Sequence, residues 1–126
     1  MTQDRPSAAE LVEAVREFLE RDVMTATDGR VQFHTRVAVN ALGMVERELV
    51  DGPAFASAEW ARAVALLGHD VDERDDVRAL ERDVAARIRD GSLDDRIDAT
   101  RAHVRATVRE KLLVANPGYL PADPSA

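Results

Sequence analysis

The chain has 126 residues, the length of one average domain, and 45% of them are hydrophobic and 33% charged, a balance typical of a folded globular protein. Acidic residues outnumber basic residues by 24 to 17, and the formal net charge of −7 argues against a nucleic-acid-binding surface. There is no cysteine, which excludes disulfides, thiol nucleophiles and cysteine-ligated metals.

A capping box predicts the start of the first helix. Ser7 is followed three residues later by Glu10, so each side chain can accept a bond from the other residue's backbone amide. Apolar residues then recur at helical spacing, which predicts a helix over residues 7–24 and a frayed segment over residues 1–6. Asp22 falls on the apolar face of this helix, where a carboxylate is unusual.

The second predicted helix, residues 30–50, has the widest apolar face of the chain, close to half of its circumference. A face this wide predicts the central helix of a bundle. Gly43 lies within the face, and we expect a neighbouring helix to cross closely there. The sequence Asp51-Gly52-Pro53 is expected to end the helix.

Three shorter helices complete the prediction, over residues 57–67, 73–89 and 95–115, with Gly68 and Gly91 closing the first two. The polar, proline-rich residues 121–126 are expected to be flexible. The sequence thus predicts an all-α fold, a single-domain bundle of about five helices around a central second helix, over residues 7–120.

Helical periodicity also predicts which side chains of the last two helices are buried. The fourth helix is expected to bury Val77, Leu80, Val84 and Ile88, and the fifth Ile97, Val104, Val108 and Leu112. Arg101 lies among the apolar residues of the fifth helix and is expected to pair with Glu81, while His103 is expected on the surface.

A candidate site combines polar residues of the first two helices. His34 lies in the apolar face of the second helix, and an antiparallel hairpin could bring it to Asp22, which would orient the imidazole for general-base catalysis. Arg36 and Asn40 could bind a carboxylate or phosphate nearby. Equally, these groups could be structural, because buried polar side chains need partners in any fold.

No cofactor and no metal site is predicted. Residues 69–76 are rich in aspartate, but Arg74 and Asp75 stand where a calcium loop needs an oxygen ligand and a glycine. The glycine-rich nucleotide-binding motifs, the Gly-x-Ser-x-Gly motif and the His-Glu-x-x-His motif are absent from the sequence. No apolar run approaches the roughly 20 residues of a membrane span, and no secretory signal is recognisable, so a cytoplasmic location is expected.

Three stretches resemble a bacterial family of uncharacterised small helical domains: residues 5–11, 33–42 and 111–120. The resemblance implies a small protein encoded beside acyl-CoA dehydrogenases and aminoglycoside-phosphotransferase-like kinases, with no established activity. It covers nearly the whole chain, and its middle stretch contains His34, Arg36 and Asn40.

Two functional hypotheses follow. The first is an accessory or protein-interaction module, not an enzyme, that binds a kinase-like or dehydrogenase-like protein or a second copy of itself through an apolar helix face. The second is a small-molecule-binding or enzymatic site, formed by His34, Arg36, Asn40 and Asp22, that acts on an acyl or phosphorylated metabolite.

Overall fold

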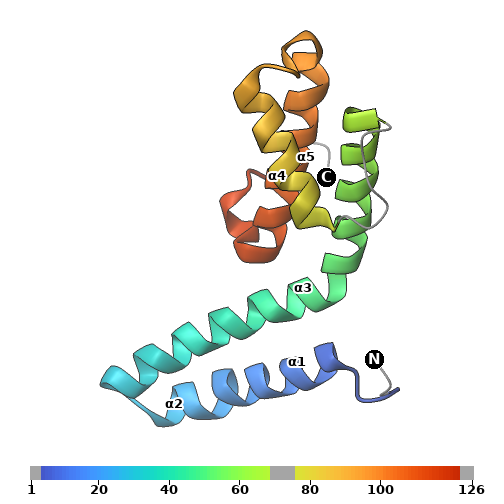
Figure 1. The fold of residues 1–126 in the computed structure, drawn as a ribbon. Helices are drawn as coiled ribbons and strands as arrows, with labels where there is room; N and C mark the ends of the chain where they lie inside the picture. The colour runs from blue at the N-terminus through green and yellow to red at the C-terminus, as the bar shows by residue number, and fades with distance from the viewer. Residues whose placement is uncertain (1–3, 69–75, 123–126) are drawn as a thin grey trace. The chain divides into compact units, whose positions relative to one another are not determined.

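The computed structural model describes residues 4–68 and 76–122, and every regular element among them is helical (Figure 1). The elements in chain order are α1 (Ala8–Phe18), a π-helical turn (Leu19–Val23), α2 (Met24–Ala26), α3 (Gly29–Leu67), α4 (Val77–Asp90), a 3₁₀ turn (Asp94–Arg96), α5 (Ile97–Ala115) and a second 3₁₀ turn (Pro117–Tyr119). The all-α prediction is confirmed. In the described residues α1, the π-helical turn and α2 follow one another directly, and we count them as one main helix. With α3, α4 and α5 this gives four main helices, where five were predicted.

The count differs because the predicted second and third helices are one helix, α3, of 39 residues. The expected stop at Asp51-Gly52-Pro53 is wrong, since Gly52 does not adopt the left-handed conformation that a C-terminal cap requires. Pro53 lies inside the helix and removes one backbone donor. The residues beyond it are good helix formers that bury side chains of their own, and this packing offsets the intrinsic cost of the proline.

Two compact units make up the chain, and the boundary between them falls within α3. The first unit contains Met1–Gly52 and Val114–Pro117, and the second contains Pro53–Leu113 and Gly118–Ala126. Pro53 is therefore the first residue of the second unit.

In the first unit, α1 and the first part of α3 lie side by side as an antiparallel hairpin (Figure 1). Arg16 Nε donates to Glu46 Oε2 at 2.8 Å and links the two helices. Gly29 opens α3 with a φ of 57°, a conformation that favours glycine. The Gln32 amide reaches back and donates to the carbonyls of Met24 and Thr27, which closes the open end of α2.

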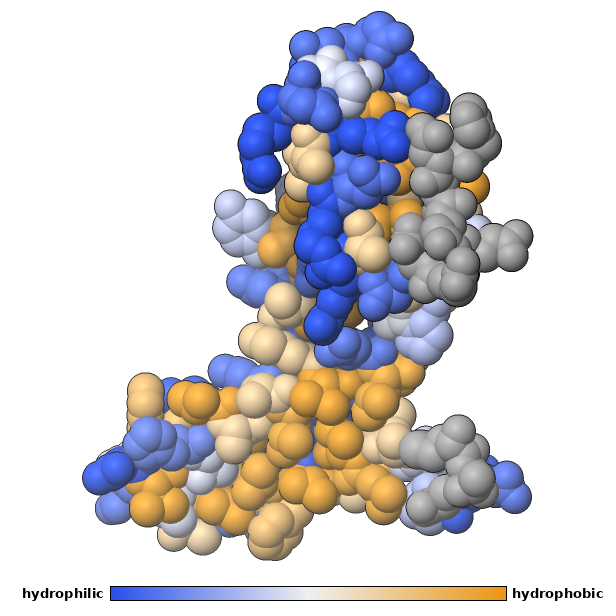
Figure 2. Space-filling view, in the orientation of Figure 1, coloured by the Kyte–Doolittle hydropathy of each residue, from blue (hydrophilic) through white to orange (hydrophobic). Residues whose placement is uncertain are grey.

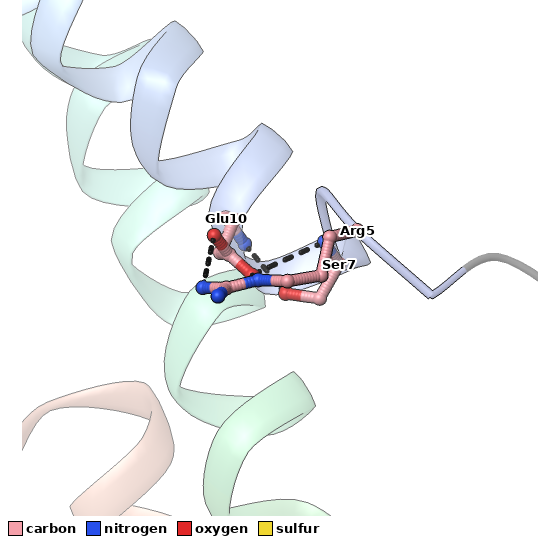
Figure 3. A network of polar contacts seen from close by, with 3 residues as sticks. All are labelled: Arg5, Ser7 and Glu10. Carbon is pink, nitrogen blue, oxygen red and sulfur yellow. Dashed lines mark hydrogen bonds and ion pairs between the residues drawn. The ribbon is translucent and has the colours of Figure 1, made fainter.

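The N-terminus of α1 carries the predicted capping box, and the prediction is confirmed (Figure 3). The Glu10 amide donates to Ser7 Oγ at 3.2 Å, and the Ser7 amide donates to Glu10 Oε1 at 3.3 Å. Arg5 Nη2 also lies 3.1 Å from Glu10 Oε2. The hydrogen bond from Arg5, followed by those from Ser7, lowers the pKa of the Glu10 carboxyl below its usual value.

Substitution Ser7→Ala should make the Glu10 amide proton exchange about five-fold faster with solvent, as measured by NMR hydrogen exchange. The loss of an N-cap acceptor costs about 1 kcal/mol, and the Glu10 amide is the donor that loses its partner. Ser7→Thr keeps the acceptor and should leave the exchange rate close to that of the wild type. Equal rates in Ser7→Ala and the wild type would contradict the cap.

The second unit contains the hydrophobic core. Its buried apolar residues come from the last part of α3, from α4 and from the turn after α4: Ala63, Leu66, Leu67, Leu80, Val84 and Leu93. Asp76 caps α4 by accepting from the Ala79 amide at 2.8 Å, and Gly91 ends α4 with a φ of 83°, as predicted. Gly68, with a φ of 71°, follows the end of α3, which also agrees with prediction.

The buried face of α5 differs from the predicted one. Thr100 and His103 are buried, whereas Ile97, Val104 and Val108 are largely exposed. The assignment of His103 to the surface is therefore wrong. The predicted pair between Arg101 and Glu81 is also wrong, because Arg101 is exposed and the carboxylate of Glu81 lies 2.9 Å from Lys111 Nζ. Relative to the prediction, α5 is turned about its own axis, so that Thr107 and Glu110 accept hydrogen bonds from Arg62 on α3.

Candidate functional site

The apolar face of α3 that was expected to be the hub of the fold is half-exposed. Among the described residues of the first unit, Thr35 is the only buried one. The hydrophobic core lies in the second unit instead, so the first half of α3 does not have the central position that its apolar width predicted. Helical periodicity cannot distinguish a side chain covered by its own chain from one covered by another.

We call nine exposed apolar residues of this hairpin the hairpin surface. Val50, which is also exposed, is not one of them. In α1, Leu11, Val15 and Phe18 recur at helical spacing, so they share one side of the helix. The first part of α3 adds two rows of apolar side chains. One row contains Phe33, Val37 and Met44, and the other contains Val31, Val45 and Leu49. All nine residues are between 41% and 60% exposed: Leu11, Val15, Phe18, Val31, Phe33, Val37, Met44, Val45 and Leu49. Figure 2 shows a continuous apolar area over α1 and the first half of α3.

The four residues proposed from the sequence lie in the first unit, and all four are exposed. Asp22 belongs to the π-helical turn, and no hydrogen bond joins it to His34 in the described part of the chain. The His34 ring packs edge-on against the ring of Phe33, with centroids 5.4 Å apart. Arg36 lies on α3, and no hydrogen bond or ion pair joins it to Asp22 or His34 in the described part of the chain.

Asn40 lines an open cavity of about 820 Å³ in the first unit, together with Arg16, Gly43 and Arg47. Arg47 Nε donates to the Val114 carbonyl at 2.8 Å, and Arg16 is paired with Glu46. A Cβ added at Gly43 would lie 3.3 Å from Arg47 Nη1, and its three nearest atoms all belong to Arg47. The expected close helix crossing at Gly43 is thus replaced by a side chain of the same helix.

A second polar cluster, which the sequence did not reveal, lies inside the second unit. Arg62 on α3 holds Glu110 on α5 with two hydrogen bonds, of 2.9 and 2.7 Å. Glu59, one turn earlier on α3, is 8% exposed, and His103 is 6% exposed. Glu59 Oε1, Arg62 Nε and His103 Nδ1 are buried atoms with no hydrogen-bond partner among residues 4–68 and 76–122. Buried polar atoms in this state are rare in native proteins.

Burial and a neighbouring carboxylate change the protonation of this cluster. Burial, and then the hydrogen bond to Glu81, raise the pKa of Glu59 to about 7. Burial alone would raise the pKa of Glu81 too, but its hydrogen bonds with Lys111 and Glu59 lower it. Burial, together with the charge of Arg62, lowers the pKa of His103. Near neutral pH, Glu59 therefore keeps its proton in part, and the lowered pKa of His103 favours the uncharged imidazole.

Glu59, Glu81 and His103 line a shallow cavity of about 240 Å³, whose other walls include Val84, Ile88, Val104 and Val108. Among the described residues, no group of three or more His, Asp or Glu side chains is arranged to hold a metal ion. The acidic stretch considered above falls on residues 69–76, of which 69–75 lie outside the described residues. No helix in the described part of the chain is long and apolar enough to cross a membrane.

Comparison with known proteins identifies a family but no function. No curated protein and no solved structure matches the chain. A family described as a domain of unknown function, DUF6285, matches residues 25–119. The match begins in α2, includes all of α3, α4 and α5, and so covers parts of both units. Because it spans most of the chain, the protein belongs to the DUF6285 family.

Proposed function

We propose that this chain is a protein-interaction module that binds another polypeptide chain through the hairpin surface. The observation that carries the proposal is that the described residues of the first unit include one buried residue, Thr35, while nine large apolar side chains lie half-exposed on its two helices. A helix of 11 residues such as α1 is marginal in water when it is isolated, so most of its stability comes from packing of its apolar side chains. Exposed apolar areas of this size typically mark interaction sites.

The resemblance to small proteins encoded beside kinase-like and acyl-CoA dehydrogenase-like enzymes supplies two candidate partners for this surface. An enzyme with an apolar groove or helix of its own would be a suitable complement, because amphipathic helices are commonly recognised through apolar anchors spaced by three or four residues. In this interpretation the chain is an accessory subunit, and the neighbouring enzyme carries the chemistry.

Substitution Phe33→Glu should weaken binding to such a partner at least ten-fold, measured by isothermal titration calorimetry with the purified kinase-like and dehydrogenase-like proteins. A charge placed in the middle of an apolar interface loses its hydration without gaining a partner. Tyr119→Glu is the matched control, since Tyr119 is an exposed aromatic residue of the second unit, and it should bind like the wild type. Binding that Phe33→Glu leaves unchanged would contradict a role for the hairpin surface.

The alternative function, a small-molecule site at His34, Arg36 and Asn40, has support from one observation. Asn40 lies in the cavity of about 820 Å³ beside two arginines, where a carboxylate or phosphate of an acyl or phosphorylated metabolite could bind. His34, Arg36 and Asp22 do not line this cavity. The interaction module accounts for more of the structure and is the function that we adopt.

A further inference from the structure

We propose that the chain covering the hairpin surface is a second copy of this protein, so that two hairpins pack face to face as a four-helix bundle. This inference rests on the proposed function, and it names a second copy, in place of a neighbouring enzyme, as the chain that covers the surface. Three features of the first unit support it: the area of the hairpin surface, its mainly apolar character and the small number of buried residues beneath it.

The area is close to what a stable dimer needs. Nine side chains, two of them aromatic and each about half-exposed, present on the order of 700 Å² of apolar surface. A specific and stable interface buries about 800 Å² on each partner. One hairpin surface therefore provides most of the area of a dimer interface.

The chemistry of the surface also fits a second copy. The nine residues are apolar, and the exposed side chains of Arg30, His34 and Glu48 lie between their two rows on α3, so a partner must cover a mainly apolar surface that contains a few polar groups. A second hairpin surface meets this requirement, because a two-fold axis places identical apolar rows against each other. Antiparallel helix pairs that meet through apolar faces form four-helix bundles, and two-fold dimers are the most common protein oligomers.

The small number of buried residues favours a partner that is always present. Thr35 alone is buried among the described residues of the first unit, so the hairpin has little interior of its own. A partner that binds only transiently would leave the hairpin surface in water between encounters, which favours unfolding or aggregation. A second copy is available wherever and whenever the chain is made. The interface then completes the core of the first unit.

The test is the mass of the full chain in solution, measured by light scattering after size exclusion at about 10 µM, a concentration suited to interfaces of this area. The wild type should have about twice the chain mass of 13.9 kDa, and Val45→Glu should have the mass of one chain. We expect the dissociation constant of Val45→Glu to rise at least ~100-fold, because a two-fold axis buries the new charge twice.

Val50→Glu is the matched control. Val50 is on the same helix and is 63% exposed, but it lies about 140° around the helix axis from Val45, away from the hairpin surface. This variant should remain dimeric. The core around Leu80 lies in the second unit, so both variants should keep the urea unfolding transition that the fluorescence of Trp60 follows there. This measurement separates loss of the interface from loss of the fold.

The outcomes separate this inference from the proposed function. A wild type that is monomeric, but binds a kinase-like or dehydrogenase-like protein in a manner sensitive to Phe33→Glu, overturns the second copy and supports the interaction module. A monomeric wild type whose α1 amides are already protected from hydrogen exchange overturns both, since the hairpin surface is then covered within one chain. A dimer that Val45→Glu leaves intact overturns the second copy at this surface.

Discussion

Truncation of Leu80 to alanine should lower the free energy of unfolding of the second unit by about 3–4 kcal/mol, the range expected when a fully buried leucine leaves a cavity. Leu80 is 1% exposed and is the largest fully buried side chain among the described residues. Leu80 is one of six residues that form the core in the described part of the chain, so few neighbouring side chains can move to fill the cavity. The effect would be a large fraction of the stability of a small domain.

Urea unfolding followed by the fluorescence of Trp60 measures this effect, because Trp60 is the sole tryptophan of the chain and belongs to the second unit. The matched control is Ile88→Ala on the same helix. Ile88 is 45% exposed, and its truncation should cost at most about 1 kcal/mol. Equal losses in the two variants would show that the core is not centred on Leu80.

Substitution Glu59→Gln should remove a pH dependence from the stability of the second unit. In the folded state Glu59 keeps its proton up to a pKa of about 7, whereas its usual value is 4.5. The folded state therefore binds more protons between these two pH values. Its stabilisation is complete below pH 4.5 and is lost as the pH rises to and through about 7, which amounts to about 2–3 kcal/mol.

Other charged groups face Glu59, so the difference between variant and wild type is the quantity to measure. Glu81, Lys111 and Arg62 interact with it, and His103 acts in the opposite direction. The lowered pKa of His103 means that its contribution is lost as the pH falls below its usual value of 6.5. Comparison of Glu59→Gln with the wild type cancels this second effect.

Urea unfolding of the two proteins at pH 5 and at pH 8 gives the required difference. The wild type should lose more stability between pH 5 and pH 8 than Glu59→Gln does, and the variant should be the more stable protein at pH 8. Glu48→Gln, which replaces an exposed glutamate of the same helix, should keep the profile of the wild type. Parallel profiles for all three proteins would rule out a raised pKa at Glu59.

Local signals in the sequence predicted most of the helix boundaries. Ser7 and Glu10 fix the start of α1, and Gly68 and Gly91 fix the ends of α3 and α4, because each of these residues acts through its own backbone neighbours. Pro53 failed as a signal for the opposite reason. The helix continues through it because distant residues of the second unit pack against the segment that follows.

The candidate site was less predictable than the fold. His34 was singled out because it lies in an apolar helix face, but that face is exposed, and no hydrogen bond joins the residue to Asp22 in the described part of the chain. His103 was assigned to the surface because polar residues surround it on α5, yet it is buried beside Arg62. Periodicity assumes an apolar interior, and the second unit has a partly polar one. The spacing of Glu59 and Arg62 on α3 was the available signal. It does not predict a buried polar cluster by itself, because the partner of Arg62 lies on α5, far away in the sequence.

The proline within α3 has a consequence for how the protein melts. Pro53 has no amide hydrogen to donate to the carbonyl of Leu49, so the ladder of hydrogen bonds along this helix has a missing rung at the junction of the two units. Cooperativity in a helix passes through consecutive rungs. We therefore expect the two parts of α3 to unfold with different free energies. Local unfolding of the hairpin segment can end at Pro53 and leave the core around Leu80 folded.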